Sequence, residues 1–223
     1  MEALLFPKAA VFDWDDTLVE SLSCIVDAIN QTRVAFGLQA WSREEARVNC
    51  RRAARETFPI WFGARWEEAR DFYYQTYRPL RENTPMQEMP GAGNLLRWLQ
   101  AGRIPVCIVS NKRHDLLCRE IERMGWQGMI AAVSGASDAS KPKPDREHVD
   151  HALAKAGLSA SADTWFVGDG DTDVLCARAA GCTPIFVGDA QEALRLNAPY
   201  RFTGCSEVLD LLVRMHEKAT VHS

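Results

Sequence analysis

The feature that most constrains the fold is a regular alternation of short apolar runs with amphipathic segments in the second half of the chain. The apolar runs, each bounded by Gly, Pro, Ser or Asp, are typical of buried strands and cover 104–110, 129–134, 164–168 and 183–187. Helical patterns lie beside them at 92–101, 113–124, 145–156 and 173–180. Strands that alternate with helices predict βαβ crossovers, and therefore an α/β fold with a Rossmann-like, doubly wound, mostly parallel sheet.

Further segments extend this core at both ends. An apolar run at 9–14 predicts a first strand, and a strand near 200–203 with a helix over 206–218 closes the domain. Residues 21–88 interrupt the alternation and predict helices near 22–36, 43–57 and 64–80. We therefore expect a core of 1–20 and 89–223 with a helical cap, 21–88, above the carboxyl ends of the strands, where open α/β sheets bind ligands.

Composition excludes several classes of protein. The chain has 223 residues, of which 47% are hydrophobic, and a net charge of −4. This balance favours a globular protein and argues against a nucleic-acid binder. We find neither an apolar run of membrane-spanning length nor a signal-peptide pattern, so we expect a cytoplasmic protein without membrane contact. Seven cysteines without a CxxC pair indicate reduced thiols rather than a zinc site.

Two pairs of acids stand at the ends of predicted strands. Asp13 and Asp15 are two apart on an extended segment, so their side chains point the same way. Asp169 and Asp173 stand where the strand over 164–168 gives way to a helix, so both can reach one point. Like charges at such short range need a cation or a proton between them, and a divalent metal is the natural partner. Each pair taken alone could also be a helix cap or a solvated turn.

Two other signals suit an anion. Ser110 ends the predicted strand over 104–110 and Asn111 follows it, close to the start of a helix whose N-terminus carries partial positive charge. Lys141 lies in a stiff Lys-Pro-Lys-Pro segment that could present its charge to a phosphate. Alternatively, Ser110 caps the helix and Lys141 is solvated. Taken together, the order acid pair, Ser, Lys, acid pair indicates phosphoryl transfer with a carboxylate nucleophile.

These motifs resemble those of the haloacid dehalogenase superfamily of phosphohydrolases. The sequence DWDDTL at 13–18 is similar to its first motif, SN at 110–111 to its second, Lys141 to its third, and GDGDTD at 168–173 to its fourth. The resemblance covers essentially the whole chain. An insertion between the first two motifs is similar to the helical-cap subgroup, which includes phosphoglycolate phosphatases.

The resemblance implies a role for each motif residue. Asp13 would be the nucleophile and Asp15 the general acid and base, while Thr17 would support Asp13. Mg²⁺ would be held by the Asp13 and Asp169 carboxylates and the Asp15 backbone carbonyl, with Asp173 acting through water. The phosphoryl group would be held by Ser110, Asn111 and Lys141. Asp16 stands where the family more often has Gly, and Asp171 has no assigned role.

The resemblance also implies a substrate class. Asp15 favours phosphate esters, because dehalogenases and phosphonatases of the superfamily lack an acid there. The cap has no early His of the phosphomutase pattern and no lysine of the phosphonatase pattern. We expect hydrolysis of a small phosphorylated metabolite, phosphoglycolate or a sugar phosphate, by a monomer or homodimer. The alternatives are a phosphomutase, a dehalogenase, or a signalling module that is phosphorylated on Asp13.

The cap carries an arginine pattern of its own. Arg43, Arg47, Arg51 and Arg55 repeat every four residues, which predicts one stripe on a helix over 43–57. The stripe would face either solvent, with nearby glutamates offsetting its charge, or an anionic substrate or partner. Arg51 and Arg52 are the candidates for substrate specificity, since guanidinium groups bind carboxylates in a bidentate fashion.

Overall fold

The computed structural model describes residues 4–221. The chain forms two compact units. The core unit contains the chain up to Val19 and from Glu88 onward, and the inserted unit is Glu20–Gln87. At each junction these bounds lie one residue from the expected ones.

The core unit is built on a six-stranded sheet in the order β3-β2-β1-β4-β5-β6. All five strand pairs are parallel, as the apolar runs predicted. The strands are β1 (Ala9–Phe12), β2 (Val106–Val109), β3 (Ala132–Ser134), β4 (Thr164–Gly168), β5 (Thr183–Val187) and β6 (Tyr200–Phe202). Chain order reverses between β1 and β4, so β1 lies at the centre with its carboxyl end at the point where ligands bind in such sheets.

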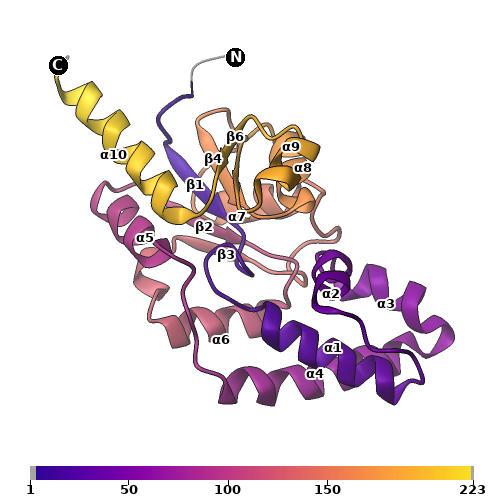
Figure 1. The fold of residues 1–223 in the computed structure, drawn as a ribbon. Coiled ribbons are helices and arrows are strands. Elements are labelled where there is room, and N and C mark those ends of the chain that lie inside the picture. Colours follow the sequence, from indigo (N-terminus) through magenta and orange to yellow (C-terminus); the bar gives the residue numbers. More distant parts are fainter. Residues whose placement is uncertain (1–3, 222–223) are drawn as a thin grey trace. The chain divides into compact units, whose positions relative to one another are not determined.

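Helices pack on both faces of this sheet (Figure 1). They are α5 (Ala92–Ala101), α6 (His114–Met124), α7 (Glu147–Lys155), α8 (Asp171–Ala180), α9 (Ala190–Arg195) and α10 (Cys205–Val221). On one face, Val11, Cys107 and Phe166 pack against α7 and α8. Elsewhere α5 packs against β2 and α10. This arrangement confirms the doubly wound α/β fold. The sequence patterns did not predict α9, nor a short 3-10 helix at Gln127–Met129.

The inserted unit is helical, as expected. Its helices are α1 (Leu22–Ala35), α2 (Arg43–Asn49), α3 (Ala54–Phe62) and α4 (Trp66–Asn83), with a 3-10 turn at Gly63–Arg65 before α4. Ser42 and Glu45 form a capping box that begins α2. The unit has a hydrophobic core of its own, in which Ile29, Ala46 and Phe58 are buried among partly buried aromatic rings.

The helix expected over 43–57 is in fact two helices. The first, α2, ends at Asn49, and Ala53 is extended before α3 begins. Ala53 is only 1% exposed, and its carbonyl accepts the amide of Glu56 to start α3. A change of direction at 50–53 lets both α2 and α3 bury residues in the core of the unit. The four arginines therefore do not form one helical stripe, because only Arg43 and Arg47 share a helix.

Candidate active site

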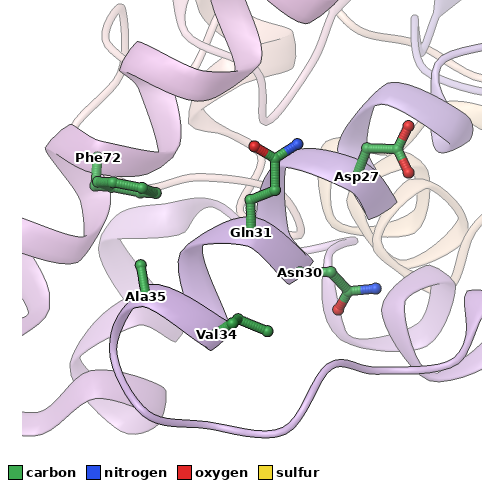
Figure 2. A pocket seen from close by; sticks show the side chains of 6 residues that line it. All are labelled: Asp27, Asn30, Gln31, Val34, Ala35 and Phe72. Carbon is green, nitrogen blue, oxygen red and sulfur yellow. The ribbon is translucent and has the colours of Figure 1, made fainter.

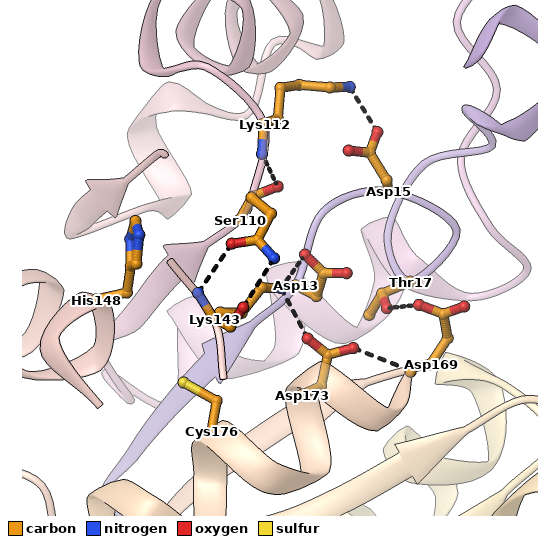
Figure 3. Close-up of polar contacts among 12 residues, drawn as sticks. Asp13, Asp15, Thr17, Ser110, Lys112, Lys143, His148, Asp169, Asp173 and Cys176 are labelled. Carbon is orange, nitrogen blue, oxygen red and sulfur yellow. Dashed lines mark hydrogen bonds and ion pairs between the residues drawn. The ribbon is translucent and has the colours of Figure 1, made fainter. Parts of the chain in front are cut away.

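Three neighbouring strands deliver polar side chains to one edge of the sheet. Asp13 follows β1, Ser110 follows β2 and Asp169 follows β4. Since β1 pairs with β2 on one side and with β4 on the other, the carboxyl ends of the three strands meet at one place. The side chains gathered there are shown in Figure 3.

A group of three carboxylates forms the centre of this site. Asp13, Asp169 and Asp173 each offer an oxygen, and these oxygens lie within 4.8 Å of one another. Asp173 reaches the group from the first turn of α8, where its Oδ2 also accepts the Gly170 amide at 2.9 Å. The Thr17 hydroxyl donates to Asp169 at 3.3 Å. This is a correction, because we expected Thr17 to support Asp13.

Lys143 supplies the positive charge inside this group. Its Nζ donates to Oδ1 of Asp13 and to Oδ1 of Asp173, each at 2.7 Å, and its side chain is only 2% exposed. Burial opposes the ammonium form more than any other single effect. The attraction and hydrogen bonds of the two carboxylates together outweigh burial and raise the pKa of Lys143 above its usual range. The lysine is therefore charged at neutral pH.

The same burial acts on the nucleophile candidate. Asp13 is buried, and desolvation raises its pKa from 3.8 to about 7, although Lys143 acts in the opposite direction. The charges of Asp173 and Asp15 also act to raise the pKa, and the value of about 7 includes all of these effects. One ammonium thus does not neutralise the acids around Asp13.

The oxygen-only character of this group fits a hard divalent cation. Such ions take carboxylate, carbonyl and water oxygens as ligands, and a cation would relieve the repulsion that raises the pKa of Asp13. The group of Asp13, Asp169 and Asp173 could therefore hold a metal. The Asp15 side chain does not belong to this group, and for Asp15 it was the backbone carbonyl that we expected at the metal.

The position expected for Lys141 is taken by Lys143, two residues further along. The Lys141 side chain is 69% exposed and pairs with Asp145 at 3.5 Å. The backbone amide of Lys141 donates to the side chain of Glu147, the first residue of α7. This corrects the expectation that Lys141 binds the phosphoryl group. Both lysines precede a proline, so the local sequence could not separate them.

Asn111 explains why Lys143 takes that place. The Asn111 side chain accepts the Lys143 amide at 2.9 Å and donates to the Lys143 carbonyl at 3.2 Å. This pair of bonds fastens the backbone of Lys143 beside the end of β2. Ser110 is buried, and its hydroxyl oxygen accepts the Lys112 amide at 3.1 Å. The structure therefore brings Ser110 and Asn111 to the site, with the Asn111 side chain holding the lysine loop.

Asp15 lies on a second, separate network. Lys112 donates to Oδ1 of Asp15 at 2.5 Å and to both carboxylate oxygens of Glu120 at 2.9 Å. The indole of Trp14 donates to the same glutamate at 2.8 Å. Our sequence reasoning missed Lys112, Glu120 and Trp14. A lysine directly after Ser110-Asn111 was the only available signal, and it did not reveal its partners.

The turn after Asp15 depends on an unusual backbone conformation. Asp16 has φ 58, in the left-handed region, and its amide donates to the Val19 carbonyl at 2.8 Å. Asp enters this region at lower cost than most residues, which explains how it replaces the Gly that is more common here. Asp171 is the first residue of α8.

The specificity candidates Arg51 and Arg52 lie between α2 and α3 in the inserted unit. Arg51 is half-buried and Arg52 is exposed. A pocket on this unit, shown in Figure 2, is lined by α1 residues such as Asp27 and Gln31 together with Phe72 of α4. Neither arginine lines this pocket.

Within residues 4–221, no helix has the length and apolar character needed to cross a membrane.

Comparison with known proteins agrees with the fold. Residues 10–187 match the haloacid dehalogenase-like hydrolase family, and the chain therefore belongs to that family. The family, the helical insertion and the enzyme class, a hydrolase, are those expected from the motifs.

Relatives carry more specific descriptions. A phosphoglycolate phosphatase from Chromobacterium violaceum is 29% identical over 92% of this chain and 96% of its own length. A phosphoglycolate phosphatase from Pseudomonas aeruginosa is 27% identical over 80% of this chain and 68% of its own. A solved hydrolase from Pseudomonas syringae has the same fold, with a TM-score of 0.79, 22% identity and coverage of 94% and 98% of the two chains.

The approach of Gly168 to Asp173 generates one prediction. A Cβ at Gly168 would lie 2.4 Å from Cβ and Cγ of Asp173, so Gly168→Ala must displace that carboxylate. We expect the variant to lose about 1–3 kcal/mol of unfolding free energy in urea titrations. Gly128→Ala is the control, because nothing lies within 4 Å of its Cβ position. Equal stability of the two variants would contradict this packing.

The pKa of Asp13 generates a second prediction. Between the usual value of 3.8 and about 7, the folded protein keeps a proton on Asp13 that the unfolded chain has lost. In EDTA, the free energy of unfolding should therefore fall as pH rises through this window. Asp13→Asn should lose this part of the pH dependence, which urea titrations at pH 5 and pH 8 measure. If the free energy of unfolding of Asp13→Asn still differs between pH 5 and pH 8 as much as that of the wild type, Asp13 is not the group responsible.

Proposed function

We propose that the protein is a Mg²⁺-dependent phosphatase that hydrolyses small phosphate monoesters through an aspartyl-phosphate on Asp13. The observation that carries this proposal is the buried Asp13 carboxylate, held at 2.7 Å by Lys143 within a group of acids that could hold a metal. Such an arrangement suits a negatively charged phosphoryl group only if cations surround it. The family and its named phosphatase relatives support the same reaction.

The residues that would hold Mg²⁺ are Asp13, Asp169 and Asp173, with the backbone carbonyl of Asp15 as a further oxygen. When bound, the ion offsets the repulsion between the nucleophile and the phosphoryl oxygens. Lys143 and Ser110 would bind the phosphoryl oxygens, together with the backbone amide of Asn111. Lys143 also favours the ionised, nucleophilic form of Asp13, because its ammonium acts to lower the pKa that burial raises.

The first half of the reaction forms a bond between Asp13 and phosphorus. A carboxylate oxygen of Asp13 attacks the phosphorus in line while the bond to the ester oxygen breaks. Asp15, in its protonated form, gives its proton to that leaving oxygen, so the alcohol departs neutral. Asp13 then carries the phosphoryl group and Asp15 is a carboxylate.

The second half returns the enzyme to its starting state. The Asp15 carboxylate takes a proton from water as the water oxygen attacks phosphorus. The bond between phosphorus and Asp13 breaks, which releases inorganic phosphate and restores the Asp13 carboxylate. Asp15 ends protonated, so the two steps together consume one water and leave both residues unchanged.

The substrate class we propose is a small monoester such as phosphoglycolate or a sugar phosphate. Two curated relatives that match most of this chain are phosphoglycolate phosphatases. Arg51 and Arg52 of the inserted unit are the residues proposed for specificity, because guanidinium groups suit a carboxylate on the substrate.

The test of the reaction is release of inorganic phosphate from p-nitrophenyl phosphate and from a panel that includes phosphoglycolate and sugar phosphates. We expect release that requires Mg²⁺ and stops with EDTA or with Asp13→Asn. Lys143→Met should lower kcat at least about a hundredfold, because charge stabilisation of this kind is typically worth 10²–10³. Lys141→Met should retain most of the activity, since its side chain is exposed.

Other outcomes would redirect the assignment. A stable phosphoryl group on Asp13 without phosphate release would favour a signalling module. Loss of activity in Lys141→Met with little effect of Lys143→Met would restore the assignment made from the motif alone.

Substrate recognition has its own test. Arg52→Met should raise KM for phosphoglycolate about tenfold, the loss of about 1.4 kcal/mol. It should leave p-nitrophenyl phosphate, which lacks a carboxylate, unchanged. Arg70→Met serves as the matched control, because Arg70 lies on α4 of the same unit and pairs with Asp71. If KM for both esters is unaffected by Arg52→Met, Arg52 does not contribute to specificity.

A further inference from the structure

A buried pair of opposite charges lies beside the site and has no part in the reaction described above. The side chains of Lys112 and Glu120 are 6% and 4% exposed, and Lys112 Nζ lies 2.9 Å from both carboxylate oxygens of Glu120. Removing two charges from water is costly, and hydrophobic residues of similar volume often stabilise a fold as well or better. The pair therefore calls for an explanation other than stability.

The orientation of Lys112 suggests that explanation. The same ammonium contacts Oδ1 of Asp15 at 2.5 Å (Figure 3). Together with its bonds to Glu120, this contact makes one lysine join two carboxylates. Glu120 is held in turn by the Trp14 indole at 2.8 Å. Trp14 is fully buried and packs edge-on against Trp126, with ring centroids 5.8 Å apart. The side chain that contacts Asp15 is thus anchored in the hydrophobic core.

Trp14 links this anchor to the site through the chain itself. It stands between Asp13 and Asp15, and side chains alternate in direction along an extended segment, so its ring points into the core while the acids point to the site. The Asp15 backbone is fixed through Trp14, and the Asp15 carboxylate is fixed through Lys112. Both constraints lead back to Glu120.

We propose that Lys112, held by Glu120 and Trp14, is a positioning residue for Asp15. This inference rests on the proposed function, in which Asp15 transfers protons at the leaving oxygen. Lys112 occupies Oδ1 and leaves Oδ2 to meet the substrate. It also holds the Asp15 side chain outside the group formed by Asp13, Asp169 and Asp173.

A purely structural role would predict a different result from this one. If Lys112 only supported the fold or the group of Asp13, Asp169 and Asp173, its loss would slow the hydrolysis of every phosphate ester to the same extent. If it positions Asp15, its loss should matter most where the leaving oxygen needs a proton. An alkyl phosphate such as phosphoglycolate has a poor leaving group, which needs a proton as it departs, whereas p-nitrophenolate is stable enough to leave as the anion. The loss in activity toward phosphoglycolate, divided by the loss toward p-nitrophenyl phosphate, therefore distinguishes the two explanations.

The experiment compares kcat/KM for phosphoglycolate and p-nitrophenyl phosphate in wild type and Lys112→Met. This parameter covers the steps up to departure of the leaving group. We expect about a hundredfold loss for phosphoglycolate, the lower end of general acid catalysis, and only a few-fold loss for p-nitrophenyl phosphate. The loss should lie in kcat rather than KM. Lys155→Met, an exposed lysine of α7, is the matched control.

Further variants keep the test decisive. Adding Lys112→Met to Asp15→Asn should cause little further loss, because both changes remove one function. If Lys112→Met fails to fold, Glu120→Gln retains the acceptor for Trp14 and should show the same substrate selectivity, more weakly. Equal losses for the two esters, or full additivity with Asp15→Asn, would overturn the proposal.

A crystallographic readout separates this inference from the proposed function. In Lys112→Met the Asp15 carboxylate should leave its wild-type orientation, and this can be seen whether or not the protein hydrolyses any ester tested. Inactivity of the wild type toward every ester would contradict the phosphatase assignment and leave the positioning of Asp15 by Lys112 untouched. An unchanged Asp15 orientation in Lys112→Met would contradict the positioning role of Lys112 and leave the phosphatase assignment untouched.

Discussion

The contact on which the rest of the site depends is the Lys143 ammonium between Asp13 and Asp173, 2.7 Å from each. Buried carboxylates repel one another and resist ionisation, so Asp13 could not be a nucleophile without a compensating charge close by. The lysine provides part of that charge. The raised pKa of Asp13 shows that it does not provide all of it, which is why the group suits a cation as well.

Several local structures serve this contact. Asn111 fastens the Lys143 backbone by two hydrogen bonds, and the absence of a side chain at Gly168 lets Asp173 approach β4. The first turn of α8 holds Asp173 through the Gly170 amide. The parallel order of the strands then brings these segments, which are far apart in sequence, to the edge where Asp13 ends β1. A second lysine, Lys112, stands in a comparable relation to Asp15.

Much of this arrangement could be predicted from residue pattern. The apolar runs predicted the strands, and the acids at their ends predicted the cluster of Asp13, Asp169 and Asp173. Prediction failed where two residues of one type competed or where partners were distant in sequence. Lys141 and Lys143 both precede prolines, and only the bonds from Asn111 distinguish them. The single helix expected over 43–57 divides in two because burial of Ala53 outweighs local helix propensity.

The sequence by itself determined the fold class, the strands that carry the site and the acids at their ends, because period and residue type act locally and repeat along the chain. Only the tertiary structure decided which lysine meets Asp13, that Thr17 donates to Asp169, and that Trp14, Lys112 and Glu120 stand behind Asp15. These outcomes depend on contacts between segments up to 152 residues apart. At that separation, packing and charge compensation choose among partners that the local sequence leaves equivalent.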